Sequence, residues 1–161
     1  MTIKRSFPPV VDAGTRVLIC GSLPGERSLA EGRYYAHPQN QFWRLVGGAI
    51  GIDLAALDYD ARLAALRAAR IGLWDVVATA RRTGSTDAAI REPVGNDLAA
   101  LIAALPDLRA VAFNGATALA HGRRHVADSL AVIALPSSSP LHTVGLAAKQ
   151  PAWDVLARYL G

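Results

Sequence analysis

Apolar residues gather in four short runs along the chain. The runs cover residues 16–20, 71–77, 108–113 and 130–135, and each is nearly continuous rather than alternating. Such runs are typical of strands that a parallel sheet buries on both faces. A carboxylate, Asp75, interrupts the second run. We therefore expect a central sheet of four strands.

Helical periodicity fills the intervals between these runs. Helices are predicted over residues 40–50, 60–69, 96–105, about 115–126 and 145–159, with Gly51 and Pro106 as stop signals. Strands that alternate with helices predict a parallel sheet covered on both faces. The expected fold is a three-layer α/β/α sandwich around a central four-stranded, mainly parallel sheet. We expect one domain over residues 1–161, with residues 1–14 as an extended lead-in and residues 81–93 as exposed loop.

The stretch from Cys20 to Trp43 stands out by its length. Loops between a strand and the next helix usually run about two to six residues, and this one is far longer and rich in Gly, Pro, Ser and aromatic residues. It follows the first strand, so it lies where open α/β sheets bind ligands. We interpret it as a functional loop rather than as a simple connection.

Charge and composition limit the partners. Seventeen Lys plus Arg against thirteen Asp plus Glu give a net charge of +4, which permits a polyanionic partner without requiring one. Cys20 is the single cysteine, and the histidines lack an acidic third ligand, so we expect no disulfide, metal or cofactor. No run approaches the roughly 20 apolar residues of a membrane span. We expect a monomeric, cytoplasmic protein with no membrane partner.

Six segments, taken in order, resemble the uracil-DNA glycosylase superfamily, and most closely its hypoxanthine-DNA glycosylase branch. They are GSLPGERS at 21–28, YYAHPQNQFW at 34–43, GLWDVV at 72–77, GSTDAAI at 84–90, FNG at 113–115 and LPSSSP at 135–140. The resemblance covers nearly the whole chain. It implies a DNA glycosylase that excises deaminated bases, hypoxanthine first and uracil second, from damaged DNA with the base flipped out.

The resemblance also implies which residue is catalytic. The better-known branches carry Asp or Asn where this chain has Leu23, and His or Asn where it has Leu135, and neither leucine can handle water. In the hypoxanthine branch an Asn of the YYAHPQNQFW segment takes the catalytic role, which implies Asn40. An amide is a weak base, but it orients water toward a cationic sugar. The alternative for Asn40 is a helix cap without chemistry.

The pocket for the base is expected to be lined by residues from four segments. Small residues let backbone amides approach the base, while two aromatic faces offer stacking. Asp75 is expected to accept the N1 hydrogen of hypoxanthine or the N3 hydrogen of uracil; alternatively, it pairs with Arg81 or Arg82, or it caps local backbone. The glycines and aromatics are equally compatible with a turn and a core. The candidate base-binding residues are Gly21, Ser22, Leu23, Pro24, Gly25, Tyr35, His37, Phe42, Asp75 and Asn114.

The DNA strand is expected to contact polar residues around this pocket. Three serines between Pro136 and Pro140 form a rigid wedge with hydroxyl groups for phosphate or groove contact. The candidates are Ser28, Arg81, Arg82, Ser85, Ser137, Ser138, Ser139, Pro140 and His142. For each arginine alone, a solvated surface charge is the simpler interpretation.

Lysine content bears on the mechanism. The chain has only Lys4, in the lead-in, and Lys149, which we expect in the last helix and away from the motif segments. Neither is then placed to form a Schiff base, so we expect a monofunctional enzyme in which water attacks C1′. Two rival interpretations stay open. One is a nucleotide- or nucleoside-binding hydrolase of the same architecture, and the other is a DNA-binding module without catalysis.

Overall fold

Four parallel strands form the central sheet of the computed structural model, which describes residues 3–142 and 144–161. All three pairings between neighbours are parallel. The strand order across the sheet is β3 (Ile71–Asp75), β2 (Val17–Gly21), β6 (Ala110–Asn114) and β7 (Ala131–Leu135). The four strands predicted from the apolar runs are therefore confirmed, with small shifts at their ends.

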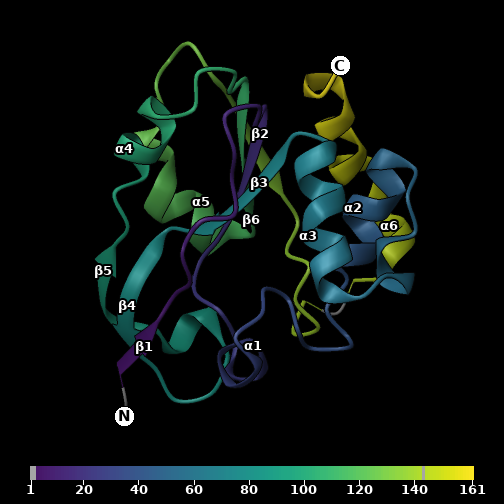
Figure 1. Ribbon diagram of the computed structural model, residues 1–161. Coiled ribbons are helices and arrows are strands. Elements are labelled where there is room, and N and C mark those ends of the chain that lie inside the picture. Colours follow the sequence, from purple (N-terminus) through teal and green to yellow (C-terminus); the bar gives the residue numbers. More distant parts are fainter. Residues whose placement is uncertain (1–2, 143) are drawn as a thin grey trace.

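Helices cover both faces of this sheet (Figure 1). One face packs against α2 (Phe42–Ile50), α3 (Tyr59–Ala68) and α6 (Leu146–Asp154), and the other against α4 (Leu98–Ala103) and α5 (Ala116–Gly122). Strand β2 shows why both faces are apolar: Val17 and Ile19 belong to the first core, and Leu18 and Cys20 to the second. The expected three-layer α/β/α sandwich is confirmed.

A second, antiparallel sheet was not predicted. It contains β1 (Ile3–Arg5), β4 (Val77–Arg81) and β5 (Arg91–Gly95) in the order β1-β4-β5. The strand predicted over 71–77 ends at Asp75, and the chain continues after Val76 as β4 of this other sheet. The exposed loop predicted over 81–93 is wrong at its end, because β5 begins within it. Every residue of β5 is exposed, so no apolar pattern marks it, and Pro93 suits an edge strand.

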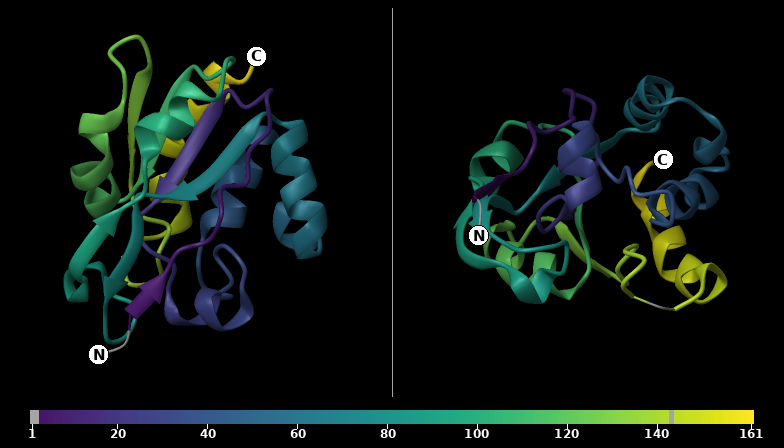
Figure 2. Two further views of the ribbon diagram at one scale, coloured as in Figure 1. Left: turned by 60° about the vertical axis from the view of Figure 1, so that its left-hand side comes forward. Right: turned by 90° about the horizontal axis from the view of Figure 1, so that it is seen from below.

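The segment predicted as a lead-in pairs with both sheets from Ile3 onward, and residues 1 and 2 lie outside the described residues. Beyond β1, Val10 and Leu73 exchange two backbone hydrogen bonds of 2.9 Å each, which brings the segment along the outer edge of β3. The left view of Figure 2 shows this segment running down the front of the molecule. Backbone pairing rather than side-chain pattern thus fixes the lead-in.

The long loop after β2 holds a helix that its sequence does not announce, α1 (Glu26–Glu31). It lies at the lower edge of Figure 1 and near the centre of the molecule seen from below in Figure 2. The chain then passes to α2, which begins at Phe42 rather than Asn40 and ends at Gly51 with a φ of 74°, as its stop signal predicts. Short 3₁₀ turns complete the chain: η1 (Leu54–Ala56), η2 (Asp87–Ala89), η3 (Arg123–His125) and η4 (Val155–Tyr159).

All three tryptophans of the chain tie a helix or strand to a loop through the indole N–H. Trp43 donates to the carbonyl of Tyr35 at 3.1 Å, Trp74 to Phe7 at 3.1 Å, and Trp153 to Pro136 at 3.0 Å. Tyr35 and Pro136 lie in the two loops that follow β2 and β7, so buried rings anchor both loops. Within the described ranges, no helix combines the length and hydropathy that crossing a bilayer requires.

Candidate active site

A cavity of about 520 Å³ opens where the parallel strands end. β2 ends at Gly21, β3 at Asp75 and β6 at Asn114, and these three residues line it. The register explains their proximity, because Gly21 and Asp75 are paired across the sheet. Carboxyl ends of parallel strands are where open α/β folds bind ligands.

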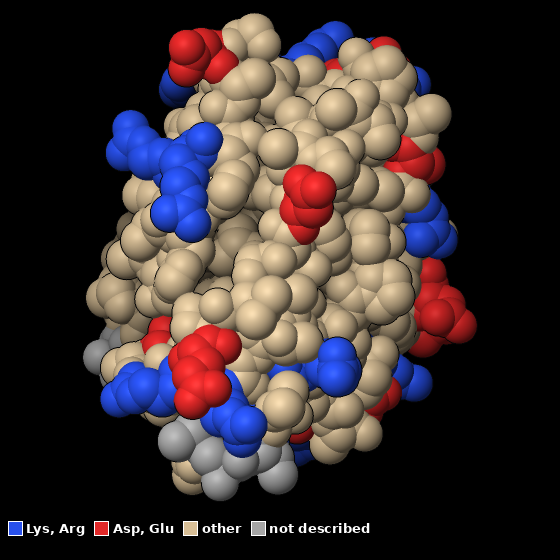
Figure 3. All heavy atoms as spheres, turned by 90° about the vertical axis from the view of Figure 1, so that its left-hand side faces the viewer, with Lys and Arg blue, Asp and Glu red and all other residues tan. Residues whose placement is uncertain are grey.

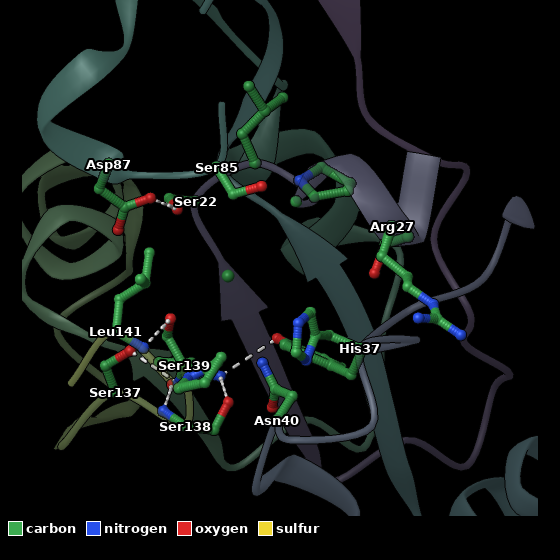
Figure 4. A pocket seen from close by; sticks show the side chains of 18 of the residues that line it. Ser22, Arg27, His37, Asn40, Ser85, Asp87, Ser137, Ser138, Ser139 and Leu141 are labelled. Atoms are coloured by element: carbon green, nitrogen blue, oxygen red, sulfur yellow. Dashed lines mark hydrogen bonds between the residues drawn. The ribbon is translucent and has the colours of Figure 1, made fainter. Parts of the chain in front are cut away.

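The structure brings most of the candidate residues to this cavity. They come from segments far apart in the sequence and face one another across it (Figure 4). The candidates that line it are Gly21, Ser22, Leu23, Pro24, Gly25, Ser28, Tyr35, His37, Asn40, Asp75, Ser85, Asn114, Ser137, Ser138, Ser139, Pro140 and His142. Three candidates, Phe42, Arg81 and Arg82, do not line it.

Phe42 lies behind the cavity wall. Its ring is fully buried and stacks on Tyr35, with centroids 3.9 Å apart and planes 10° from parallel. The expectation that Phe42 offers a face to a base is therefore wrong: Phe42 supports Tyr35, and Tyr35 lines the cavity. Tyr35 has a φ of 52°, a conformation that a bulky residue adopts only where its surroundings impose it.

Asn114 connects two walls of the cavity. Its Oδ1 accepts from the backbone N–H of Ser138 at 2.9 Å, while its Nδ2 donates to Ser138 Oγ at 2.9 Å and to the Tyr35 hydroxyl at 3.3 Å. Asn114 and Ser138 are both buried. The end of β6 thus fixes the serine loop and the tyrosine, and Ser138 serves this network more than the solvent.

Asn40 is half-buried in the cavity wall. Its Oδ1 accepts from the backbone N–H of Phe42 at 2.9 Å, and its backbone N–H donates to the His37 carbonyl at 2.9 Å. The side chain thus forms a turn directly before α2, whose cap residue is Gln41, and this bond leaves its two amide hydrogens available. Exposed His37 beside it accepts from Gln39 N–H through Nδ1 at 3.1 Å.

Asp75 is the buried acid of the site. Its side chain is 4% exposed, and Oδ2 has no hydrogen-bond partner among the described residues. Burial first and nearby Asp87 second raise the pKa of Asp75 to about 7, against the opposing effect of Arg82. Gly21 leaves the space that this carboxyl needs, because a Cβ there would lie 2.6 Å from Oδ1.

Asp87 is a site residue that the sequence did not single out. It begins η2 and lines the cavity, where its Oδ1 accepts from Ser22 Oγ at 2.6 Å (Figure 4). The sequence resemblance includes the segment GSTDAAI, but it predicts only Ser85 of that segment as a DNA contact. Ser85 Oγ instead accepts from the backbone N–H of Glu26 at 2.9 Å, so this segment closes over the first loop.

Leu141 is the second site residue that the sequence missed. It follows the serine loop, lines the cavity and is 60% exposed. An exposed leucine is unremarkable alone, but this one is held beside Ser139, whose Oγ accepts from its backbone N–H at 3.1 Å. An exposed apolar side chain on a hydrogen-bonded backbone therefore stands at the rim of the cavity.

Arg82 is not a surface residue. It is 1% exposed, and its Nη2 donates to the Pro24 carbonyl, so it braces the first loop from behind. The expectation that Arg82 contacts a DNA phosphate is wrong, because a buried guanidinium cannot reach one. Arg81 points elsewhere and pairs with Glu92 at 3.3 Å.

Lys149 lies against the serine loop rather than away from the motif segments, which corrects a further expectation. It is 1% exposed, and its Nζ donates to the carbonyls of Ser137 at 2.6 Å and His142 at 3.2 Å. Burial lowers the pKa of Lys149. Lys149 does not belong to the cavity lining, so its ammonium group holds the loop from outside.

Positive charge is not gathered on the face that carries β5 and α4. Figure 3 shows lysine and arginine side chains there interspersed with acidic ones, over a largely uncharged surface. A polyanion would gain little from this face. The cavity edge, with its hydroxyl groups and backbone amides, is the better-equipped surface.

The fold and the cavity define the class: an α/β/α protein with a cavity at the carboxyl edge of a parallel sheet. Residues 8–157 match the family model described as the uracil DNA glycosylase superfamily. The chain belongs to this superfamily, and the family expected from the sequence is confirmed.

Relatives from two Methanosarcina species support the same family. A protein of Methanosarcina barkeri named hypoxanthine DNA glycosylase is 46% identical over 112 residues, which cover 70% of this chain and 71% of that protein. One of Methanosarcina acetivorans with the same name is 39% identical over 98% of this chain and 99% of its own length. The solution NMR structure of a candidate uracil DNA glycosylase from Methanosarcina acetivorans matches with a TM-score of 0.89 and 39% identity, over 99% of each chain.

Proposed function

We propose that this protein is a DNA glycosylase that excises hypoxanthine, and uracil second, from DNA. The observation that carries the proposal is the cavity, which joins a stacked tyrosine, a buried acid and an asparagine amide at one sheet edge. The two relatives named hypoxanthine DNA glycosylase support hypoxanthine as the first base.

A base inside a duplex must be flipped out before its glycosidic bond is reached. The exposed side chain of Leu141 at the rim suits an apolar wedge that fills the vacated stack. Once inside, the base stacks on Tyr35 and meets Asp75 with its polar edge. The hydroxyls of Ser137 and Ser139, with Ser85 and His142 nearby, are the proposed contacts to the DNA strand. Ser28 is buried instead, and its Oγ accepts from the backbone N–H of Ala36 at 3.0 Å.

Asn40 is the proposed catalytic amide. Its Oδ1 is engaged by Phe42 N–H, so its Nδ2 is the group that faces the reaction. In that role Asn40 orients a water molecule toward C1′ as positive charge develops on the sugar. We further propose that the enzyme is monofunctional and monomeric and that it acts in the cytoplasm.

The test is single-turnover excision from oligonucleotides, duplex and single-stranded, that carry one deoxyinosine or deoxyuridine. The wild-type protein is expected to leave an alkali-labile abasic site at deoxyinosine. Asn40→Ala is expected to lower the rate at least about tenfold, the scale of one lost electrostatic contact, with little change in duplex binding.

Gln39→Ala is the matched control, because Gln39 is exposed in the same turn and does not line the cavity. A rate loss in Asn40→Ala no larger than in Gln39→Ala would remove Asn40 from the mechanism. Binding of the duplexes without any alkali-labile product would favour the non-catalytic rival.

A further inference from the structure

Two carboxyl groups meet the cavity in contrasting surroundings. Asp75 reaches it from the end of β3, an edge strand of the central sheet, and Asp87 from the turn η2. A third acid in the lining, Glu26, is half exposed and pairs with Lys4 at 3.1 Å. Asp75 and Asp87 are therefore the acids that the fold itself holds at the site.

The surroundings of Asp75 favour a neutral carboxylic acid. A buried carboxylate is costly unless donors compensate it, yet Oδ2 has no partner among the described residues. Its neighbour across the sheet, Gly21, contributes no side chain. At neutral pH a large fraction of Asp75 carries a proton, since its pKa is raised to about 7. The titratable groups that interact with it are Cys20, Tyr34, Tyr35, Arg82 and Asp87.

Among these neighbours, only Arg82 favours the ionised form. Its Nη2 is committed to the Pro24 carbonyl, and its effect on Asp75 is the smallest of the three causes. The phenols of Tyr34 and Tyr35 and the thiol of Cys20 have pKa values raised by burial, so they stay neutral. Asp87 adds a like charge that favours protonated Asp75.

Asp87 is held differently. It is half-buried, and the Ser22 hydroxyl donates to its Oδ1 at 2.6 Å. This short bond to a carboxylate fixes its orientation at the cavity wall. Ser22 directly precedes Leu23, the position where the better-known branches of the superfamily carry an acid or amide. A carboxylate from another segment thus contacts the residue that directly precedes Leu23.

We propose that these two carboxyl groups divide the proton transfers of the reaction, with Asp75 donating to the departing base and Asp87 accepting from the attacking water. The inference rests on the proposed function. Pairs of acids in contrasting surroundings perform this division in glycoside hydrolysis generally. Asp87 also supplies the proton acceptor that Asn40 cannot be, because an amide orients water but cannot take its proton.

The atoms balance as follows for hypoxanthine. The C1′–N9 bond breaks and its electron pair moves to the base, which receives the Asp75 proton and departs neutral. The water oxygen forms the new bond to C1′ and one water proton moves to Asp87. Asp75 ends ionised and Asp87 protonated, and exchange with solvent restores both.

The first test is the pH profile of single-turnover excision from a deoxyinosine duplex. The wild-type rate is expected to fall at least about tenfold between pH 6 and pH 9, because Asp75 must be protonated. Asp75→Asn donates a hydrogen bond but no proton. It is expected to be about 100-fold slower at pH 6, without a fall through pH 7.

Parallel profiles for the two proteins would overturn the inference, because any shared fall would arise from the base and not from Asp75. The proposed function would survive that result. It fails separately if wild-type protein excises hypoxanthine at no pH.

The second test distinguishes the effect of the Asp87 carboxylate from the effect of the Ser22 hydroxyl that bonds to it. Asp87→Asn keeps an oxygen for Ser22 but cannot accept a proton, whereas Ser22→Ala keeps the carboxylate and removes its hydrogen bond. Asp87→Asn is expected to lose about 100-fold in rate and Ser22→Ala less than about tenfold. Binding to a duplex with uncleavable 2′-fluoro-deoxyinosine is expected to stay within about threefold of wild type.

Two results would overturn the assignment of Asp87. One is an Asp87→Asn rate equal to wild type. The other is a loss of 2′-fluoro-deoxyinosine binding as large as the loss of rate, which would make Asp87 a binding residue.

Discussion

Burial makes the contribution of Asp75 to stability depend on pH. Its pKa rises from 3.8 to about 7 on folding, so the folded protein binds this proton more tightly than the unfolded chain. The stabilisation is complete below about pH 4 and is lost as pH rises through about 7. The shift corresponds to about 4 kcal/mol at most.

Asp75→Asn is therefore expected to gain stability relative to wild type as pH rises. The amide fills the same space but does not ionise, so the wild-type penalty at alkaline pH is absent. Urea unfolding of both proteins at pH 4.5 and pH 8.5 measures the difference, which is expected to change by a few kcal/mol. An equal difference at the two pH values would contradict the burial argument.

The sequence predicts which residues stand at the site better than it predicts where their side chains point. Strands β2 and β6 end at Gly21 and Asn114, and Asn40 precedes helix α2. Their place at the sheet edge therefore follows from topology. Phe42 and Tyr35 are both aromatic, and only packing decides that one ring covers the other. Asp87 depends on a bond to Ser22, 65 positions away in sequence, which no local pattern encodes.

At the scale of elements, α6 is the support of the loop over residues 137–142. Lys149 lies in this helix and donates to carbonyls at both ends of that loop. Hydrogen bonds from a charged donor contribute about 1.5–3 kcal/mol each. The last helix of the chain therefore determines the shape of a cavity wall without touching the cavity.

Lys149→Met is expected to lower Tm by about 6 °C or more, because the thioether keeps the buried length but leaves two carbonyls unpaired, and each kcal/mol shifts the Tm of a chain of this size by about 2–4 °C. Excision is expected to weaken with it, as the serine loop loosens. The matched control is Lys4→Met, which removes a partly exposed ion pair with Glu26 and is expected to change stability by less than about 1 kcal/mol. Similar Tm shifts for the two variants would argue against a role of Lys149 in holding the loop over residues 137–142.

Elements were predictable in proportion to their burial. The apolar runs of β2, β3 and β6 are buried almost throughout, so composition alone reveals them, whereas β7 alternates between buried and more exposed residues and is revealed by its apolar composition alone. Strand β5 is exposed throughout and holds its place by backbone pairing with β4. Helix α1 has six residues and one buried side chain, Ser28, too little for a periodic signal.

For the whole molecule, the small number of lysines restricts the chemistry. Lys4 pairs with Glu26 and Lys149 is bound to two carbonyls, and neither side chain lines the cavity. The strand is expected to stay intact after excision until alkali is added, and borohydride is expected to trap no protein–DNA adduct. An adduct that disappears in Lys149→Ala would contradict attack by water.

The tryptophan bonds give the protein a built-in optical readout. Trp43 and Trp153 are buried and donate to carbonyls of the two loops that frame the cavity, while Trp74 is tied to the lead-in. Indole emission responds to the polarity and hydrogen bonding around the ring. Movement of either loop as a base enters would therefore alter the intrinsic fluorescence, so that base capture is timed separately from bond cleavage without any attached dye.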